Sequence, residues 1–207
     1  MSTVKLNIVF YSSTGTNFQI AQEMQKAAEE AGANVRLRKV HELAPQAAID
    51  SNPAWKATVE AMADIPEVSP EDMEWANAYI LGSPTRFGNM AAQMKQFIDT
   101  LGGLWFNGAL ANKVASAFTS AQNTHGGQEV TIHSLHTVFN HWGCIIVPPG
   151  YTDPVVFANG GNPYGTSTNG VSRDQPTLSE TTKAAAAHQA RRVVQVAGWL
   201  AAGQQSE

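Results

Sequence analysis

Short β-prone segments alternate with helical patterns along this chain, and this alternation limits its possible folds more than any other feature. The strand patterns lie at residues 6–11, 35–38, 78–81, 114–118 and 145–147. The helical patterns lie at residues 18–31, 54–63, 90–101, 128–142 and 177–202. A strand, a helix and a second strand in close succession form a unit whose two strands run parallel. The sequence therefore predicts an α/β fold.

Five strands favour a doubly wound parallel sheet in the order 2-1-3-4-5 with helices on both faces, because the six-stranded dinucleotide-binding arrangement needs one more strand. Ligands of such sheets bind at the carboxyl ends of the strands, near the point where the strand order reverses. We therefore expect a binding site in the loops after the first, third and fourth strands. Ser69-Pro70 is typical of a helix start, and Gly102-Gly103 is expected to end the helix over 90–101.

The chain has 207 residues, which fits a single domain over residues 1–207 with insertions near 45–70 and 151–176. The second insertion is rich in Gly, Asn, Pro and Thr and has no clear period. Loops of this length inside a compact domain usually serve function or form an interface. We therefore expect a long loop over 151–176 that takes part in one of these.

Composition excludes several classes of protein. The formal net charge is −4, whereas a nucleic-acid-binding protein usually shows a basic face. Cys144 is the only cysteine, so an internal disulfide and a multi-cysteine metal site are both excluded. The start of the chain lacks the features of a signal peptide, and no apolar run reaches the roughly 18 residues of a membrane span. We expect a cytoplasmic protein with no nucleic-acid or membrane partner.

The loop after the first strand reads Ser12-Ser13-Thr14-Gly15-Thr16-Asn17 and opens the first helix. Hydroxyl groups and unpaired N–H groups at a helix N-terminus form an anion site. The loop has no lysine, so it is not a nucleoside-triphosphate loop, and its single glycine excludes the dinucleotide fingerprint. A monophosphate held without a fixed cation fits this loop. A simple helix cap fits the same residues equally well.

The two other loops are ambiguous when each is considered alone. Residues 83–89 contain Phe87, an aromatic side chain on a loop that could pack on a planar group, although a turn with a buried Phe explains the segment better. Residues 120–127 end in a glycine pair that lets the backbone approach a ligand, although a flexible connector explains it too. Their shared position at one edge of the sheet, beside the first loop, favours a ligand site.

Other candidate sites carry less weight. His133, His136 and His141 lie in one helix, and His133 and His136 share a face, but no carboxylate or cysteine completes a ligand set, so we expect no metal. His141, near the end of that helix, could simply face the helix dipole. Cys144 precedes an apolar strand and reads as a buried small residue rather than a nucleophile.

Longer motifs identify a resemblance to a known family. Thr14-Gly15 resembles the FMN phosphate loop of flavodoxin-like proteins. Five further segments are similar to the WrbA family, the flavodoxin-like NAD(P)H:quinone oxidoreductases. They are Pro84-Thr85-Arg86-Phe87-Gly88-Asn89-Met90, Gly102-Gly103-Leu104-Trp105, Gly126-Gly127-Gln128-Glu129, and the pair Pro148-x-Gly150-Tyr151 and Pro163-Tyr164-Gly165. The match covers almost the whole chain.

The resemblance implies a flavodoxin-like homotetramer with one FMN per chain that reduces quinones by two electrons with NADH or NADPH. It assigns cofactor binding to the three loops and to His141, catalysis to His141 and Trp105, and substrate binding to Thr14 and Trp105. The implied loop residues are Ser12, Ser13, Thr14, Gly15, Thr16, Asn17, Thr85, Arg86, Phe87, Ser120, Ala121, Gln122, Asn123, Thr124, His125 and Gly126.

This chain departs from the family pattern at two places. Thr14 stands where the family often has an aromatic residue, and the third loop is one residue longer and poorer in glycine than usual. Two other functions remain open: a flavodoxin-type one-electron carrier, and a non-enzymatic protein that binds a transcription regulator.

Overall fold

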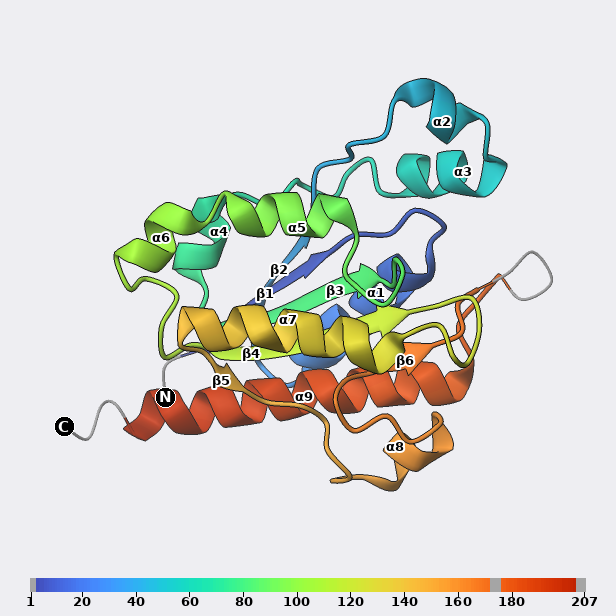
Figure 1. Ribbon diagram of the computed structural model, residues 1–207. Coiled ribbons are helices and arrows are strands. Elements are labelled where there is room, and N and C mark those ends of the chain that lie inside the picture. The colour runs from blue at the N-terminus through green and yellow to red at the C-terminus, as the bar shows by residue number, and fades with distance from the viewer. Residues whose placement is uncertain (1–2, 172–175, 204–207) are drawn as a thin grey trace.

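The structure is a computed structural model that describes residues 3–171 and 176–203. Its centre is a parallel sheet in the order β2-β1-β3-β4-β5, which confirms the predicted order (Figure 1). The strands are β1 (Lys5–Phe10), β2 (Asn34–Lys39), β3 (Ala78–Pro84), β4 (Val114–Ser120) and β5 (Ile145–Ile146). The strand order reverses between β1 and β3, so the loops that follow these two strands meet at one edge.

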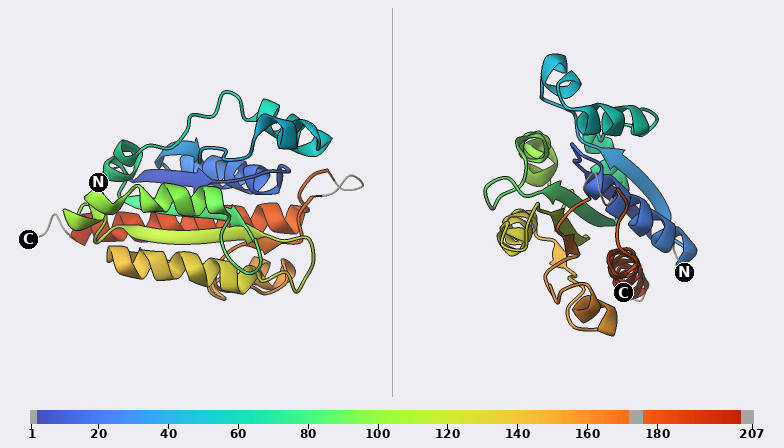
Figure 2. Two further views of the ribbon diagram at one scale, coloured as in Figure 1. Left: turned by 45° about the horizontal axis from the view of Figure 1, so that its top comes forward. Right: turned by 90° about the vertical axis from the view of Figure 1, so that its right-hand side faces the viewer.

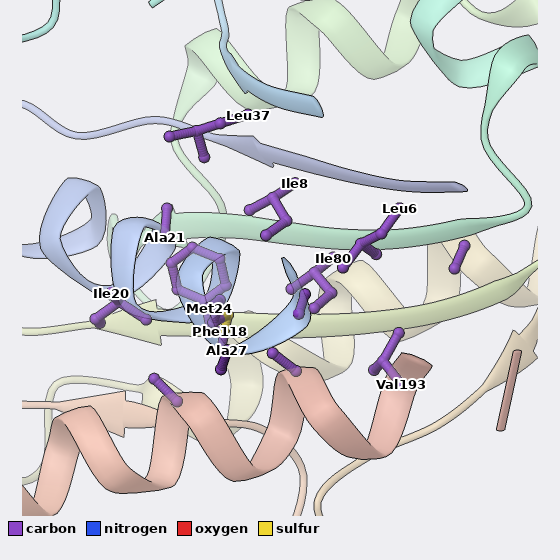
Figure 3. Close-up of a cluster of buried hydrophobic side chains, with 14 of the residues drawn as sticks. Leu6, Ile8, Ile20, Ala21, Met24, Ala27, Leu37, Ile80, Phe118 and Val193 are labelled. Atoms are coloured by element: carbon purple, nitrogen blue, oxygen red, sulfur yellow. The ribbon is translucent and has the colours of Figure 1, made fainter. Parts of the chain in front are cut away.

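Helices cover both faces of the sheet, as predicted (Figure 2). Hydrophobic side chains of α1 (Thr16–Glu30) and α9 (Glu180–Gly203) pack on one face, and those of α4 (Pro70–Trp75), α5 (Ala92–Asp99) and α7 (Gln128–Trp142) pack on the other. The strands serve both layers because successive side chains point to opposite faces. Ile8 and Ile80 therefore face α1 and α9 (Figure 3), whereas Val9 and Leu81 face α5 and α7.

Gly82 and Phe118 lie opposite each other on β3 and β4. The Phe118 ring fills the space above Gly82, so a Cβ atom at position 82 would overlap that ring. Phe118 is fully buried in the core beside α1, and Figure 3 shows it next to Met24. The strand therefore needs a residue without a side chain at position 82.

Residues 151–171 are not the long loop that the sequence indicated. They contain a short helix, α8 (Pro154–Ala158), and a two-residue strand, β6 (Ser167–Thr168), that pairs in parallel with the end of β4. Asp153 caps α8 with its side chain, and Pro154 occupies the first turn. Elements this short leave no measurable period in a sequence. Residues 172–175 of the expected loop lie outside the described residues.

Two further short helices differ from expectation. The segment near 45–70 holds α2 (Gln46–Asp50) as well as the expected α3, which runs over Pro53–Ala61. Gly102-Gly103 do not end the preceding helix, because α5 already stops at Asp99, and these glycines open α6 (Gly102–Phe106) instead. The Trp105 N–H donates to the Leu101 carbonyl across 3.0 Å, which joins α6 to the chain before it.

Candidate functional site

A cavity of about 620 Å³ lies where the loops after β1, β3 and β4 meet, at the carboxyl edge of the sheet. These loops lie to the right of the strands in Figure 1. The cavity brings together most of the predicted loop residues, and it adds residues from α3 and from the segment after β6. Its lining consists of Ser12, Ser13, Thr14, Thr16, Asn17, Asn52, Trp55, Pro84, Thr85, Arg86, Phe87, Ser120, Ala121, Gln122, Asn123, Gly126, Asn169, Gly170 and Val171.

Three predicted residues lie on the loops but not in the lining. Thr124 and His125 are on the far part of the third loop. Gly15 faces a larger adjoining groove of about 1300 Å³ between α1 and α3. The groove and the cavity share Thr14, Asn52, Gln122, Asn169 and Val171. The structure therefore brings the three loops together but separates these positions from the cavity wall.

The first loop presents unpaired backbone donors. From Ser12 to Phe18, no backbone N–H finds an acceptor within the described part of the chain; the first paired amide is Gln19, which donates to the Gly15 carbonyl across 3.0 Å. Gly15 has a φ of 91°, which favours glycine, and it lets the chain turn directly into α1. The helix also begins without an acidic residue in its first turn. Unpaired amides and a helix N-terminus together favour a bound anion.

Polar side chains of the same loop are buried beside these amides. Ser12, Ser13, Thr16 and Asn17 are all buried. The Asn17 amide nitrogen donates to the Tyr11 carbonyl across 3.2 Å, but its Oδ1 atom has no partner among the described residues. Buried polar atoms are normally paired, so an unpaired one at a cavity wall indicates a ligand or ordered water.

The second loop is held to the third by hydrogen bonds. The Thr85 N–H donates to the Ser120 carbonyl across 2.8 Å, and the Thr85 hydroxyl donates to the Gly126 carbonyl across 3.1 Å. Gly127 has a φ of 88°, and a Cβ atom there would lie 2.8 Å from the Gly88 Cα atom. The two loops thus touch backbone to backbone. This contact needs glycine at position 127 and gives the cavity a fixed wall.

Arg86 is the one charged residue in the described lining of the cavity. Its guanidinium donates to the Ser13 hydroxyl across 3.1 Å and to the Thr85 carbonyl across 3.0 Å. The sequence predicted a phosphate loop without a fixed cation, but the folded chain brings this cation to the first loop from the second.

Phe87 stands at the cavity wall with its side chain fully exposed and a φ of 54°. A positive φ is uncommon for a residue with a side chain, and an exposed aromatic ring gains no burial in the isolated chain. The alternative interpretation of Phe87 as a buried turn residue is therefore wrong. Strained residues of this kind cluster at ligand sites.

The sequence did not indicate the part of the wall formed by Asn52, Trp55 and residues 169–171. Asn52 caps α3 by accepting from the Ala54 and Trp55 N–H groups, and α3 carries Trp55 to the cavity. The segment after β6 reaches the first loop, where the Val171 N–H donates to the Thr16 hydroxyl across 3.0 Å. Asn-Pro at the start of α3 was the available signal.

Trp105 and His141 lie together, but not in this cavity. The Trp105 indole donates to the His141 carbonyl across 2.9 Å, and both line a separate groove of about 280 Å³ formed by α5, α6 and α7. His141 is at the last turn of α7, whereas the third loop precedes the first turn. An α-helix rises about 1.5 Å per residue, so roughly 20 Å separate the two ends. α6 accordingly lies at the far end of Figure 1 from the loops.

His133, His136 and Cys144 lie outside the lining of the cavity. The rings of His133 and His136 pack edge to face with centroids 5.8 Å apart. Burial, followed by the neighbouring His133, lowers the pKa of His136 to about 4. Burial raises the pKa of the Cys144 thiol to about 12, which fits the prediction that it is not a nucleophile. The described residues contain no cluster of three or more metal-ligating side chains.

Within residues 3–171 and 176–203, none of the helices combines the length and apolarity that crossing a bilayer requires.

The geometry of the cavity suits a ligand with one anionic group and one planar group. The unpaired amides of the first loop and Arg86 can hold the anion. The remaining wall is neutral and offers hydroxyls, amides and aromatic rings, which bind and orient a planar heterocycle.

Several known proteins are similar to this chain in sequence. Residues 7–153 match the family described as NADPH-dependent FMN reductase. The chain is 56% identical to a protein named NAD(P)H dehydrogenase (quinone) from Deinococcus radiodurans, over 95% of this chain and 97% of that protein. It is 40% identical to one of the same name from Aromatoleum aromaticum, over 97% and 99% of the two chains.

Solved structures show the same fold. A flavodoxin described as a WrbA-like protein from Agrobacterium tumefaciens superposes with a TM-score of 0.66 at 18% identity, over 95% of this chain and 99% of that chain. A flavodoxin from the domain Archaea superposes with a TM-score of 0.60 at 12% identity, over 94% and 99% of the two chains.

Proposed function

This chain belongs to the NADPH-dependent FMN reductase family, and we propose that it reduces quinones to hydroquinones with two electrons from NADH or NADPH, using one FMN per chain. The observation that carries the proposal is the row of unpaired amides between Ser12 and Phe18 beside Arg86. A family that binds FMN and relatives named for quinone and NAD(P)H support the choice of cofactor and substrates.

The residues of the cavity fit FMN. A phosphate monoester needs donors and one compensating charge, which the first loop and Arg86 supply. An isoalloxazine ring is uncharged, and the rest of the described lining has no charged side chain. Pockets that bind small molecules and cofactors usually measure about 300–1,000 Å³, and the cavity of about 620 Å³ lies within that range.

FMN held in this cavity would supply a two-electron carrier between NAD(P)H, which gives a hydride, and a quinone, which takes up two electrons and two protons, the second proton coming from solvent; the protein would supply binding, orientation and exclusion of water. In this proposal the first loop, Ser12 to Asn17, holds the phosphate. Thr85 and Phe87 line the ring, and Arg86 reaches from the ring to the phosphate loop. Residues 120–126 contact the polar edge of the ring and the ribityl chain.

In this proposal Trp105 and His141 reach the cavity of a neighbouring chain when the protein forms a homotetramer. They are remote from the cavity of their own chain, yet Trp105 leaves 52% of its surface exposed. A homotetramer in which a neighbouring subunit presents them would place Trp105 as an aromatic wall of the substrate pocket and His141 near the flavin. The substrate contact expected of Thr14 is compatible with its exposed position at the cavity wall.

The test begins with the visible absorption of the purified protein before and after adding NADH, followed by benzoquinone. We expect a yellow protein that NADH bleaches and benzoquinone restores. A single pocket that holds one planar substrate at a time predicts ping-pong kinetics with parallel double-reciprocal lines. A colourless protein that does not take up FMN, or a flavoprotein that neither NADH nor NADPH reduces, would contradict the proposal and favour a non-enzymatic role or an electron carrier.

Subunit sharing has its own test. Trp105→Ala is expected to raise KM for both substrates two- to tenfold, since stacking contributes about 0.5–1.5 kcal/mol. Co-expression of Trp105→Ala with a variant that cannot hold FMN should restore sites with wild-type KM, because some cavities then pair with an intact Trp105 from the neighbour. Light scattering that finds only monomers at full activity, or hybrids that restore nothing, would remove the shared site.

A further inference from the structure

α3 lies over the first loop and forms a wall of the cavity that the three strand loops do not provide. Asn52 and Trp55 line the cavity. One turn further along α3, the Thr58 hydroxyl would be 3.4 Å from a Cβ atom placed on Gly15. The Thr58 side chain is itself buried. The helix is therefore packed on the loop that holds the anion.

The Trp55 indole has a fixed orientation. Its Nε1–H donates to the Glu42 carboxylate across 3.2 Å. The same carboxylate accepts from the Tyr11 hydroxyl across 2.9 Å, from the Gln93 amide across 2.7 Å and from the Ala44 N–H across 3.0 Å. Glu42 thus joins α3 to the end of β1 and to the first turn of α5. An anionic acceptor makes these hydrogen bonds stronger than neutral ones.

The environment of Tyr11 keeps this network intact. Burial, and then the charge of Glu42, raise the pKa of Tyr11 above its usual range. The hydroxyl therefore stays protonated and remains a donor. Gln93 donates to Tyr11 as well as to Glu42, across 3.0 Å to the phenol oxygen. Trp55 is therefore held by Glu42 in the segment after β2, which is itself fixed by Tyr11 after β1 and by Gln93 in α5.

The indole has only one polar atom, and Glu42 already binds it. What Trp55 offers the cavity is therefore an apolar aromatic surface. Apart from Phe87, it is the only aromatic side chain in the described lining. A half-buried tryptophan with its donor satisfied elsewhere is suited to packing against a planar group.

We propose that Trp55 contacts the isoalloxazine ring in the cavity and that Glu42 is the positioning residue that holds it there. This inference rests on the proposed function, because it assumes that FMN is the occupant. It adds a cofactor contact from α3, a segment that the family motifs do not include.

The first test compares FMN affinity, measured by quenching of FMN fluorescence, in the wild type and in Trp55→Ala, Trp55→Phe and Trp199→Ala. Trp199 is exposed on α9 and does not line the cavity, so its variant is a matched control. Trp55→Ala should raise the Kd roughly two- to tenfold. Trp55→Phe should retain most of the affinity, and Trp199→Ala should match the wild type.

Tryptophan emission gives a second readout that does not depend on activity. The chain has five tryptophans, and the one in contact with flavin should lose the most emission when FMN binds. Trp55→Phe should therefore remove a larger share of the FMN-induced quenching than Trp199→Phe. Equal shares, together with equal Kd values for Trp55→Ala and Trp199→Ala, would overturn the contact.

The role of Glu42 is tested by a double-mutant cycle. Glu42→Ala should weaken FMN binding two- to tenfold, and adding it to Trp55→Ala should cause little further loss, because the carboxylate acts through Trp55. Additive losses would show that Glu42 acts independently and would refute its positioning role. Wild-type protein that fails to bind FMN would instead refute the proposed function, so the two failures are distinguishable.

Discussion

The guanidinium of Arg86 and the hydroxyl of Ser13 lie 3.1 Å apart, and this hydrogen bond joins the loop after β3 to the loop after β1. The two strands are neighbours at the point where the strand order reverses. The bond therefore places a positive charge beside the unpaired amides of the first loop.

Arg86→Gln should weaken FMN binding by about 1.5–3 kcal/mol, roughly ten- to a hundredfold, because a charged donor to the phosphate is lost. Arg86→Lys should fall between this variant and the wild type, since it keeps the charge but not the planar fork. Titrations at low and high ionic strength provide the check. The Gln variant should also show a weaker salt dependence. An unchanged Kd in Arg86→Gln would mean that the guanidinium does not meet the phosphate.

Gly15→Glu should abolish FMN retention in a folded protein, because its side chain, although directed toward Thr58 in the adjoining groove, would add a negative charge at the helix N-terminus that binds the phosphate. The backbone φ of 91° strains any side chain at this position, so Gly15→Ala is the control for strain without charge. We expect the Ala variant to purify yellow and the Glu variant to purify colourless, with matching circular dichroism. Glu and Ala variants of equal colour would contradict the phosphate assignment of the loop.

Gly82→Ala should destabilise the protein by roughly 3 kcal/mol, because the added Cβ would overlap the Phe118 ring. Chemical denaturation measures this loss. Phe118→Leu in the Gly82→Ala background should recover part of it by making room, although Phe118→Leu alone should destabilise the wild type. If the double variant lost as much free energy of unfolding as the two single variants together, the two positions would not be coupled in this way.

His136 should make the protein less stable as the pH falls. Its pKa is lowered from an ordinary value of 6.5 to about 4, first by burial and then by His133. Between these pH values the unfolded chain binds a proton that the folded chain refuses, so stability drops as the pH falls through this range. Relative to His136→Phe, the wild type should lose roughly 2 kcal/mol between pH 6.5 and pH 4, as measured by denaturation at each pH. Parallel pH profiles would assign the acid sensitivity to other groups.

The strand order and the long helices could be predicted from the sequence because each buried strand and each amphipathic helix repeats its pattern several times. The short elements could not. β6 has two residues, and α8 has five, so neither spans enough chain to show a period. Their positions depend on contacts with β4 and α9 that are remote in sequence. The Gly102-Gly103 pair was expected to end a helix but begins α6, because glycine can stand at either end of a helix.

The sequence predicted the parts of the site that lie in loops directly after the strands. The rule that ligands lie at the carboxyl edge of the sheet selected the three loops, and the structure brings them together around one cavity. It could not select Trp55 or Asn169, which reach the cavity from α3 and from the segment after β6. Trp105 and His141 came from resemblance alone, and a single chain places them in another groove.

The segment that follows β6 sets the order in which this cavity can be built. Ala121 donates to Thr168, Val171 donates to Thr16, and residues 169–171 form part of the wall. A protein leaves the ribosome amino end first, so all three strand loops exist before the segment that closes them. A prematurely terminated chain would contain every loop of the phosphate and ring site and still have an open cavity. Tight cofactor uptake would then report that synthesis has passed beyond β6.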